Sequence, residues 1–267
     1  MKIRSIIFFL SLVLSQFSCR ETLDIDLEEA EPRIAVFALL TNQEGPYKVQ
    51  ISRTKSFYST EDQAKVQDAV VTLSDNFGES ELLIETEPGI YETQNFQGRV
   101  GRMYTLTIQA EGQTYTSQSE LKNILPVDSI KFRYYDQPDL LHQRGYYPVS
   151  YAKTPPGETN YYLWKFYRND TLLHNKNQLF IAEDRFVQEN INGLEGPFVY
   201  QLGDKLRIES FSLTKEAYDF YLHLQNQLNN DGGFFSGPPA NPQTNIHGGA
   251  LGVFQVSGME IDELIVE

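Results

Sequence analysis

Apolar and polar residues alternate along much of the first half of the chain. Residues 47–52 and 104–109 each place an apolar side chain at every second position, a period typical of strands that bury one face. The apolar run at 34–40 also has strand length, and residues 66–73 are predicted to form a further strand. Turn-forming residues separate the segments at intervals of about ten residues. This pattern predicts a β-sandwich, which we place at residues 34–123.

The second half of the chain is richer in aromatic residues, and these mark its predicted strands. Residues 146–152, 161–167 and 205–211 combine aromatic with aliphatic side chains, the residue types that strands favour. Pro126 precedes the first strand of this half and marks a boundary. We therefore expect a second β-rich domain at residues 124–267, which makes the protein mainly β.

One amphipathic helix is predicted at about residues 214–229. Thr214 is a suitable N-cap, and Glu216 suits the first turn because it interacts favourably with the helix dipole. Apolar residues recur at spacings of three and four and form a single stripe. The members of this stripe are Ala217, Phe220, Tyr221, Leu224 and Leu228. We expect the stripe to pack across a sheet.

The first residues of the chain have the pattern of a secretory signal. Lys2 and Arg4 precede an apolar run at residues 6–14 that is too short to span a bilayer. The only cysteine of the chain, Cys19, follows at the expected cleavage point. We therefore predict a lipoprotein signal peptide at residues 1–18 and lipidation of Cys19; an ordinary secretory signal with an incidental cysteine is the alternative.

The chain carries a formal net charge of −14, and acidic residues crowd the segment after the cysteine. We expect residues 19–33 to form an extended acidic tether, because they offer little apolar surface. Such a charge excludes nucleic acid as a partner. Acidic residues behind a lipidated cysteine also resemble the signal that sends Bacteroidetes lipoproteins to the outer face of the outer membrane.

The order of the predicted strands in the first domain adds a resemblance. Residues 69–75, 89–91, 101–108 and 112–115 follow one another as in immunoglobulin-like or transthyretin-like modules of secreted bacterial proteins. The resemblance implies the fold alone, since one fold serves many functions.

A longer string near the C-terminus resembles one family in particular. Residues 239–254, which end in a predicted closing strand at 253–256, resemble the DUF4249 lipoproteins of Bacteroidetes, as do residues 126–130. His247 departs from the family pattern, in which a small residue is common. The resemblance implies an accessory role beside a TonB-dependent outer-membrane transporter, because the genes of such lipoproteins often accompany those receptors.

The same string holds a candidate partner-binding loop between residues 238 and 249. Its prolines predict a pre-ordered segment, and Asn241 and Asn245 offer donors and acceptors there. Gly248 and Gly249 complete the candidate site. The alternative is structural: glycines and an asparagine are also the residues that awkward turns require.

Exposed aromatic residues support a competing interpretation. Neighbouring residues of a strand point to opposite faces, so the pairs 134–135, 146–147 and 161–162 should each expose one tyrosine ring. Exposed rings can stack on sugars, which would suit a stand-alone glycan-binding or adhesion module. Ser129 and Thr171 lie in strings that resemble the O-glycosylation motif of Bacteroidetes exported proteins.

Catalytic and metal-binding motifs are not recognisable in the sequence. The four histidines are scattered, and the string at 248–252 lacks the lysine and hydroxyl residue of a phosphate-binding loop. We expect no cofactor, no metal and no enzymatic activity. A surface hydrolase remains the alternative, since paired carboxylates can come from distant parts of a chain.

Overall fold

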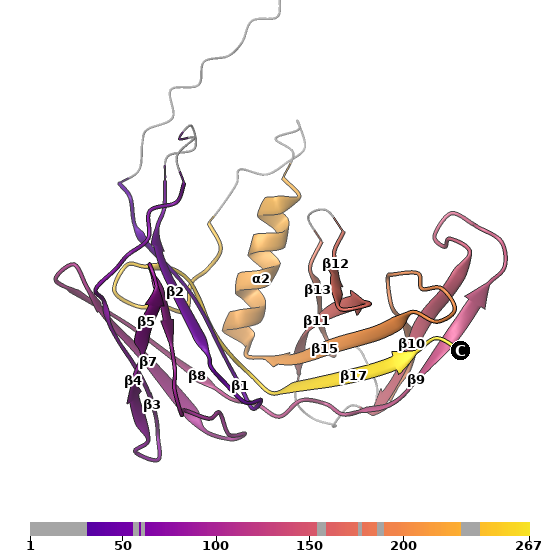
Figure 1. Cartoon of the computed structure of the whole chain (residues 1–267), viewed down its shortest axis with the longest axis horizontal. Coiled ribbons are helices and arrows are strands. Elements are labelled where there is room, and N and C mark those ends of the chain that lie inside the picture. The colour runs from indigo at the N-terminus through magenta and orange to yellow at the C-terminus, as the bar shows by residue number, and fades with distance from the viewer. Residues whose placement is uncertain are drawn as a thin grey trace, which may run out of the picture. The chain divides into compact units, whose positions relative to one another are not determined.

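The computed structural model describes the chain from residue 31 onward, with gaps. The described residues are 31–55, 59, 62–153, 159–175, 178–185, 190–230 and 241–267. The predicted signal peptide at 1–18, Cys19 and most of the predicted acidic tether lie outside them. Residues Met1–Glu31 and Pro32–Glu267 form two separate units, and everything below concerns the second (Figure 1).

Two sheets near the N-terminus form the expected β-sandwich. One sheet has the order β16-β1-β2-β6-β5 and the other the order β4-β3-β7-β8. The strands of the first are β1 (Ile34–Thr41), β2 (Lys48–Arg53), β5 (Ile84–Glu87), β6 (Ile90–Glu92) and β16 (Leu251–Ser257). Those of the second are β3 (Val70–Asp75), β4 (Ser80–Leu82), β7 (Met103–Ala110) and β8 (Gln113–Glu120). Every second residue of β2 and β7 is buried between the sheets, as the alternation predicted.

Strand β16 corrects the predicted division of the chain at residue 124. This strand pairs in parallel with β1, from Ala35 opposite Leu251 to Thr41 opposite Ser257. The C-terminal part therefore supplies an edge strand to the N-terminal sandwich. The predicted closing strand at 253–256 exists and is longer, but its partner is a strand more than two hundred residues earlier, which local patterns do not reveal.

Glycine at position 252 permits this parallel pairing. Its φ is +108°, a region that side chains other than glycine rarely adopt. A Cβ atom there would lie 1.8 Å from the carbonyl oxygen of Val36. Gly252 therefore lets the two backbones approach each other at the junction of the two halves.

Two further sheets make up the C-terminal half. The smaller has the order β14-β10-β9, and the larger the order β12-β11-β15-β17, with β13 also paired to β11. The smaller contains β9 (Val127–Tyr135), β10 (Gly145–Lys153) and β14 (Asn190–Glu195). The larger contains β11 (Tyr161–Arg168), β12 (Thr171–Leu173), β13 (Phe180–Glu183), β15 (Lys205–Leu213) and β17 (Met259–Ile265). Strand β17 was not predicted, because acidic residues interrupt its apolar ones.

Helix α2 (Lys215–Leu228) confirms the predicted amphipathic helix. Its N-cap is Thr214, whose hydroxyl oxygen accepts a hydrogen bond from the Ala217 amide at 3.3 Å. The stripe buries Ala217, Phe220 and Tyr221, whereas Leu228 at the end is 44% exposed. The helix packs against β11, β13 and β15 on one side and against β16 on the other (Figure 1).

Other elements cover both faces of β11. Tyr161 points to the helix face, where it packs with Leu213 and Phe220, while Tyr162 points to the face opposite β9 and β10. Both tyrosines are buried, with exposed fractions of 9% and 4%. The expectation that each tyrosine pair exposes one ring is therefore wrong for 161–162, because a helix covers the face that a simple sandwich would leave in solvent.

No helix among the described residues combines the length and the apolar character needed to cross a bilayer.

Candidate functional site

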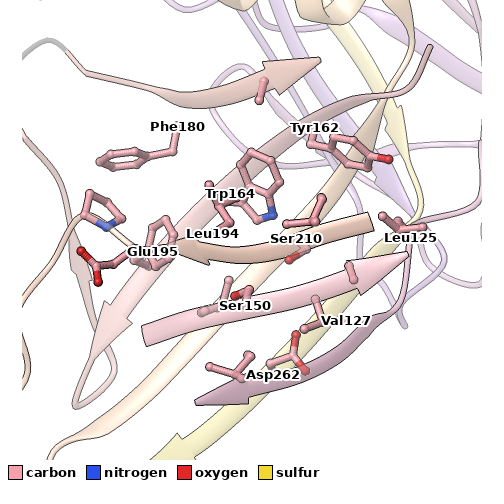
Figure 2. A pocket seen from close by; sticks show the side chains of 18 of the residues that line it. Leu125, Val127, Ser150, Tyr162, Trp164, Phe180, Leu194, Glu195, Ser210 and Asp262 are labelled. Carbon is pink, nitrogen blue, oxygen red and sulfur yellow. The ribbon is translucent and has the colours of Figure 1, made fainter. Parts of the chain in front are cut away.

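A cavity of about 280 Å³ lies between the two C-terminal sheets. Strands β11, β13 and β15 supply one wall, and β9, β10 and β14 supply the other. Most of its lining is apolar. Side chains that line it include Leu125, Val127, Ser150, Tyr162, Trp164, Phe180, Leu194, Glu195, Ser210 and Asp262 (Figure 2).

Aromatic residues form the wall on the side of β11 and β13. The rings of Tyr162 and Trp164 stack at a centroid distance of 5.5 Å. Phe166 and Phe180 meet edge to face at 5.4 Å. The Tyr162 hydroxyl donates to Asp184 Oδ2 at 3.2 Å, and burial raises the pKa of Tyr162. This hydroxyl is therefore a fixed donor rather than a proton-transfer group at neutral pH.

Two polar residues of the lining, Ser210 and Asp262, have side-chain atoms without hydrogen-bond partners. Asp262 of β17 lies opposite Ile208 of β15, so that both face the cavity. Ser210 is 2% exposed. The Ser210 Oγ and Asp262 Oδ2 atoms are buried without a hydrogen-bond partner. Burial raises the pKa of Asp262, and the neighbouring Glu260 raises it further. Buried polar atoms without partners are uncommon in folded proteins and require an explanation.

Glu195, the other acidic residue of the lining, is fully engaged. Its Oε2 accepts from Arg133 Nη1 at 2.9 Å, and its Oε1 lies 2.8 Å from His142 Nε2. The other ring nitrogen of His142 lies 3.0 Å from Asp139. The bond to Asp139, and then that to Glu195, raise the pKa of His142, and the pKa of Asp139 falls to about 2. Glu195 is therefore a structural acid, in contrast to Asp262.

A second depression of about 470 Å³ adjoins the cavity. The two share Tyr162, Trp164, Ala182, Ile191 and Leu194. The lining of the second depression is mostly apolar as well, and Asp184, Asn190 and Asn192 contribute polar groups to it. Trp164 thus lines both the second depression and the cavity.

The candidate partner-binding loop is largely built into the fold. Asn245 donates through Nδ2 to the Phe254 carbonyl at 2.8 Å and accepts from the Phe254 amide at 2.9 Å. Its own carbonyl accepts from Ser117 Oγ at 2.7 Å. The side chain of Asn245 therefore satisfies the backbone of β16 on the side away from β1. These contacts favour the structural interpretation of Asn245.

The two glycines of this loop also have structural roles. Gly248 has a φ of +98°, and a Cβ atom there would lie 2.6 Å from the Thr114 carbonyl oxygen. The Gly249 carbonyl accepts from Arg33 Nε at 2.9 Å. Asn241, by contrast, is exposed, and residues 238–240 lie outside the described part. Partner binding by the loop stays a prediction, and Asn241 is the residue best placed to test it.

The other predicted sites lie apart from the cavity. Thr171 is exposed at the start of β12, directly after the turn residues Asn169 and Asp170, both of which have positive φ. Ser129 is exposed on β9. Their glycosylation and the lipidation of Cys19 stay predictions. Within the described ranges, no group of three or more histidine, cysteine or acidic side chains is arranged to hold a metal.

Sequence patterns did not reveal the cavity. In the sequence, the cavity was indicated only by polar residues at inward positions of apolar strands, such as Ser210 and Asp262. Such residues are often paired in the folded protein, so their position alone did not distinguish a site from a core hydrogen bond.

Comparisons with known proteins support the assignment of the family. No curated protein matches the chain significantly. Among solved structures, a two fibronectin type-III domain segment from chicken tenascin matches at 11% sequence identity over 68% of this chain and 90% of that chain, with a TM-score of 0.22. The strands described above establish by themselves that the protein is mainly β. The model of the domain of unknown function DUF4249 matches residues 20–260, and the chain therefore belongs to the DUF4249 family.

Proposed function

We propose that this protein is a non-enzymatic binding protein that uses the cavity between its C-terminal sheets to hold a small molecule. The observation that carries this proposal is the cavity itself, with apolar walls and few polar groups. Ligand sites are typically concave and mostly apolar, and a small number of polar groups in them fix the ligand's orientation.

The chemistry of the lining favours binding over hydrolysis. Two carboxylates, Glu195 and Asp262, line the cavity, as a glycosidase would require. Glu195, however, is held by Arg133 and His142. Both carboxylate oxygens of Glu195 are therefore already occupied by these partners. The arrangement thus offers one free acid rather than a working pair.

The proposed place of action is the outer surface of a Bacteroidetes outer membrane. The signal-like residues 1–18, Cys19 and the acidic residues behind it support a lipid anchor at this surface. Two acyl chains would hold the protein stably, whereas one chain would bind only marginally. We further propose that the protein serves a TonB-dependent transporter by presenting substrate or covering its mouth.

Co-purification from native membranes in mild detergent tests this proposal. A TonB-dependent receptor should elute with the wild-type protein in near-stoichiometric amount. The matched control is Cys19→Ala, which should be released into the periplasm and recover little receptor. Purification of the wild type without any such receptor would contradict the accessory role, and membrane retention of an acylated Cys19→Ala protein would contradict the anchor.

A further inference from the structure

We infer that the cavity binds a small amphiphilic amine, with its apolar body against Trp164 and its protonated amino group at Asp262 and Ser210. This inference rests on the proposed binding function and adds the chemical class of the ligand. It depends on the size of the cavity, the charge of its lining and the buried polar atoms of that lining.

The size of the cavity suits a molecule larger than a single ring. An engineered apolar cavity of about 150 Å³ binds benzene, and the cavity here has a volume of about 280 Å³. Its walls are mostly apolar, which disfavours sugars and phosphates because their polar groups would lose water without gaining partners. An aromatic or short aliphatic body fits both the volume and the lining.

The charge of the lining favours a cation. Among the described residues that line the cavity, none is a lysine, arginine or histidine, whereas Asp262 and Glu195 are acidic. Arg133 and His142 already pair with Glu195. Asp262 lies instead beside a second acid, Glu260, and both have a buried oxygen without a hydrogen-bond partner. A fatty acid anion would be repelled here, and an ammonium group would be attracted.

The hydrogen-bonding groups also match an amino group. An ammonium has three donors and no acceptor. Asp262 Oδ2 and Ser210 Oγ, both buried without partners, can accept from it. Ser150 faces the same space from β10 and offers a further hydroxyl. Ser210 lies opposite Trp164 in the sheet, and Asp262 lies opposite Ile208 on the next strand, so these side chains line the same cavity (Figure 2).

Three probes with the same apolar body test the inference: 4-phenylbutylamine, 4-phenylbutanol and 4-phenylbutyrate. Trp164 is the only tryptophan of the chain and lines the cavity, so its fluorescence reports binding without a label. The full chain with Cys19→Ala is the suitable form, because it requires no detergent that could itself enter the cavity. We expect the amine to bind at least about tenfold more tightly than the alcohol, since charged hydrogen bonds are the stronger ones, and the carboxylate to bind most weakly.

Two substitutions assign this preference to Asp262 and Ser210. Asp262→Asn should remove the advantage of the amine over the alcohol while the alcohol still binds. Ser210→Ala should weaken binding of the amine several-fold and leave the order of affinity of the three probes unchanged. Glu263→Gln is the matched control, because Glu263 lies on the same strand and pairs with Lys205 instead of lining the cavity; it should bind all three probes as the wild type does.

The outcomes separate the ligand class from the proposed function. If the alcohol or the carboxylate binds as tightly as the amine, or if Asp262→Asn keeps the amine's advantage, the amine assignment is wrong and the cavity remains a binding site. If none of the probes changes Trp164 fluorescence in a folded protein, as judged by cooperative melting, binding in the cavity is wrong as well. A water molecule held by Ser210 and Asp262 would then account for their unpaired atoms.

Discussion

The two halves of the protein are built from the same kind of amphipathic strand, yet one is filled and the other is hollow. In the N-terminal sandwich, large side chains such as Ile51, Tyr91 and Tyr104 are at most 1% exposed and fill the space between the sheets. Between the C-terminal sheets, Ser210 and Asp262 occupy inward positions and line a cavity that is partly open to solvent.

Two buried hydroxyls, those of Ser117 and Ser210, differ in their hydrogen bonding. Ser117 of the N-terminal sandwich donates to the Asn245 carbonyl at 2.7 Å, so its burial is balanced by a hydrogen bond. Ser210 in the C-terminal half is 2% exposed and its Oγ has no partner. Ser119 Oγ of β8 is also buried without a partner, so an unpaired hydroxyl alone does not mark a ligand site. Ser210 differs from Ser119 in lining the cavity, where a ligand could reach it.

The largest expected effect concerns the junction of the two halves. Gly252→Ala would place a Cβ atom against the Val36 carbonyl and should disrupt the pairing of β1 with β16. We expect a loss of more than about 4 kcal/mol of unfolding free energy, or failure to fold. Gly112→Ala is the matched control, because Gly112 also has positive φ but no atom within 4 Å of the added Cβ. It should lose only about 1–2 kcal/mol, and equal losses in urea unfolding would contradict this account of the junction.

A smaller effect is expected in the loop that braces β16. Asn245→Ala removes both bonds to the Phe254 backbone and should lower the unfolding free energy by about 2–4 kcal/mol. Asn241→Ala, at an exposed position, should leave thermal melting unchanged. If Asn241→Ala instead loses a co-purifying transporter while melting normally, the exposed part of the loop is an interface. Normal melting of Asn245→Ala would contradict its structural role.

In the cavity, one substitution should increase stability. Burial raises the pKa of Asp262 above 3.8, so the folded state disfavours the charged form. Below pH 3.8 the Asp262 carboxyl is protonated in both the folded and the unfolded protein. As the pH rises through the higher pKa of the folded state, the free energy of unfolding decreases. Asp262→Asn should therefore raise the melting temperature at neutral pH by about 1–3 °C, with the gain vanishing in acid. A pH-independent difference between the two proteins would contradict the unpaired state of this acid.

The smallest expected effect concerns His142. Hydrogen bonds to Asp139 and then Glu195 raise its pKa above 6.5, so its stabilising contribution is full below pH 6.5 and is lost as the pH rises through the folded pKa. His142→Gln should slightly reduce the dependence of the melting temperature on pH, because Arg133 still pairs with Glu195 in the variant. Melting curves recorded below pH 6.5 and above the folded pKa of His142 test this prediction. If the melting temperature of the wild type increases relative to that of the variant as the pH rises, the protonated His142 does not stabilise the fold.

Local patterns predicted the elements of the fold better than their associations. The alternation at 47–52 and the three-and-four spacing at 214–229 depend on neighbouring residues, so the strand and the helix followed from the sequence. The parallel pairing of β16 with β1 depends on residues far apart in the chain and did not. The cavity was equally hidden, because its volume depends on how two sheets are spaced rather than on which face each turns inward.

The central claim is that the cavity in the C-terminal half binds a ligand. A substitution that fills the cavity tests this claim most directly. Ala182 of β13 lies opposite Tyr162 in the sheet and lines the cavity beside Trp164, so Ala182→Phe would occupy that space. Titration with 4-phenylbutylamine should give a saturable change in Trp164 fluorescence in the wild type and none in folded Ala182→Phe. An unchanged titration in the filled variant would show that the probe binds elsewhere and would contradict the claim.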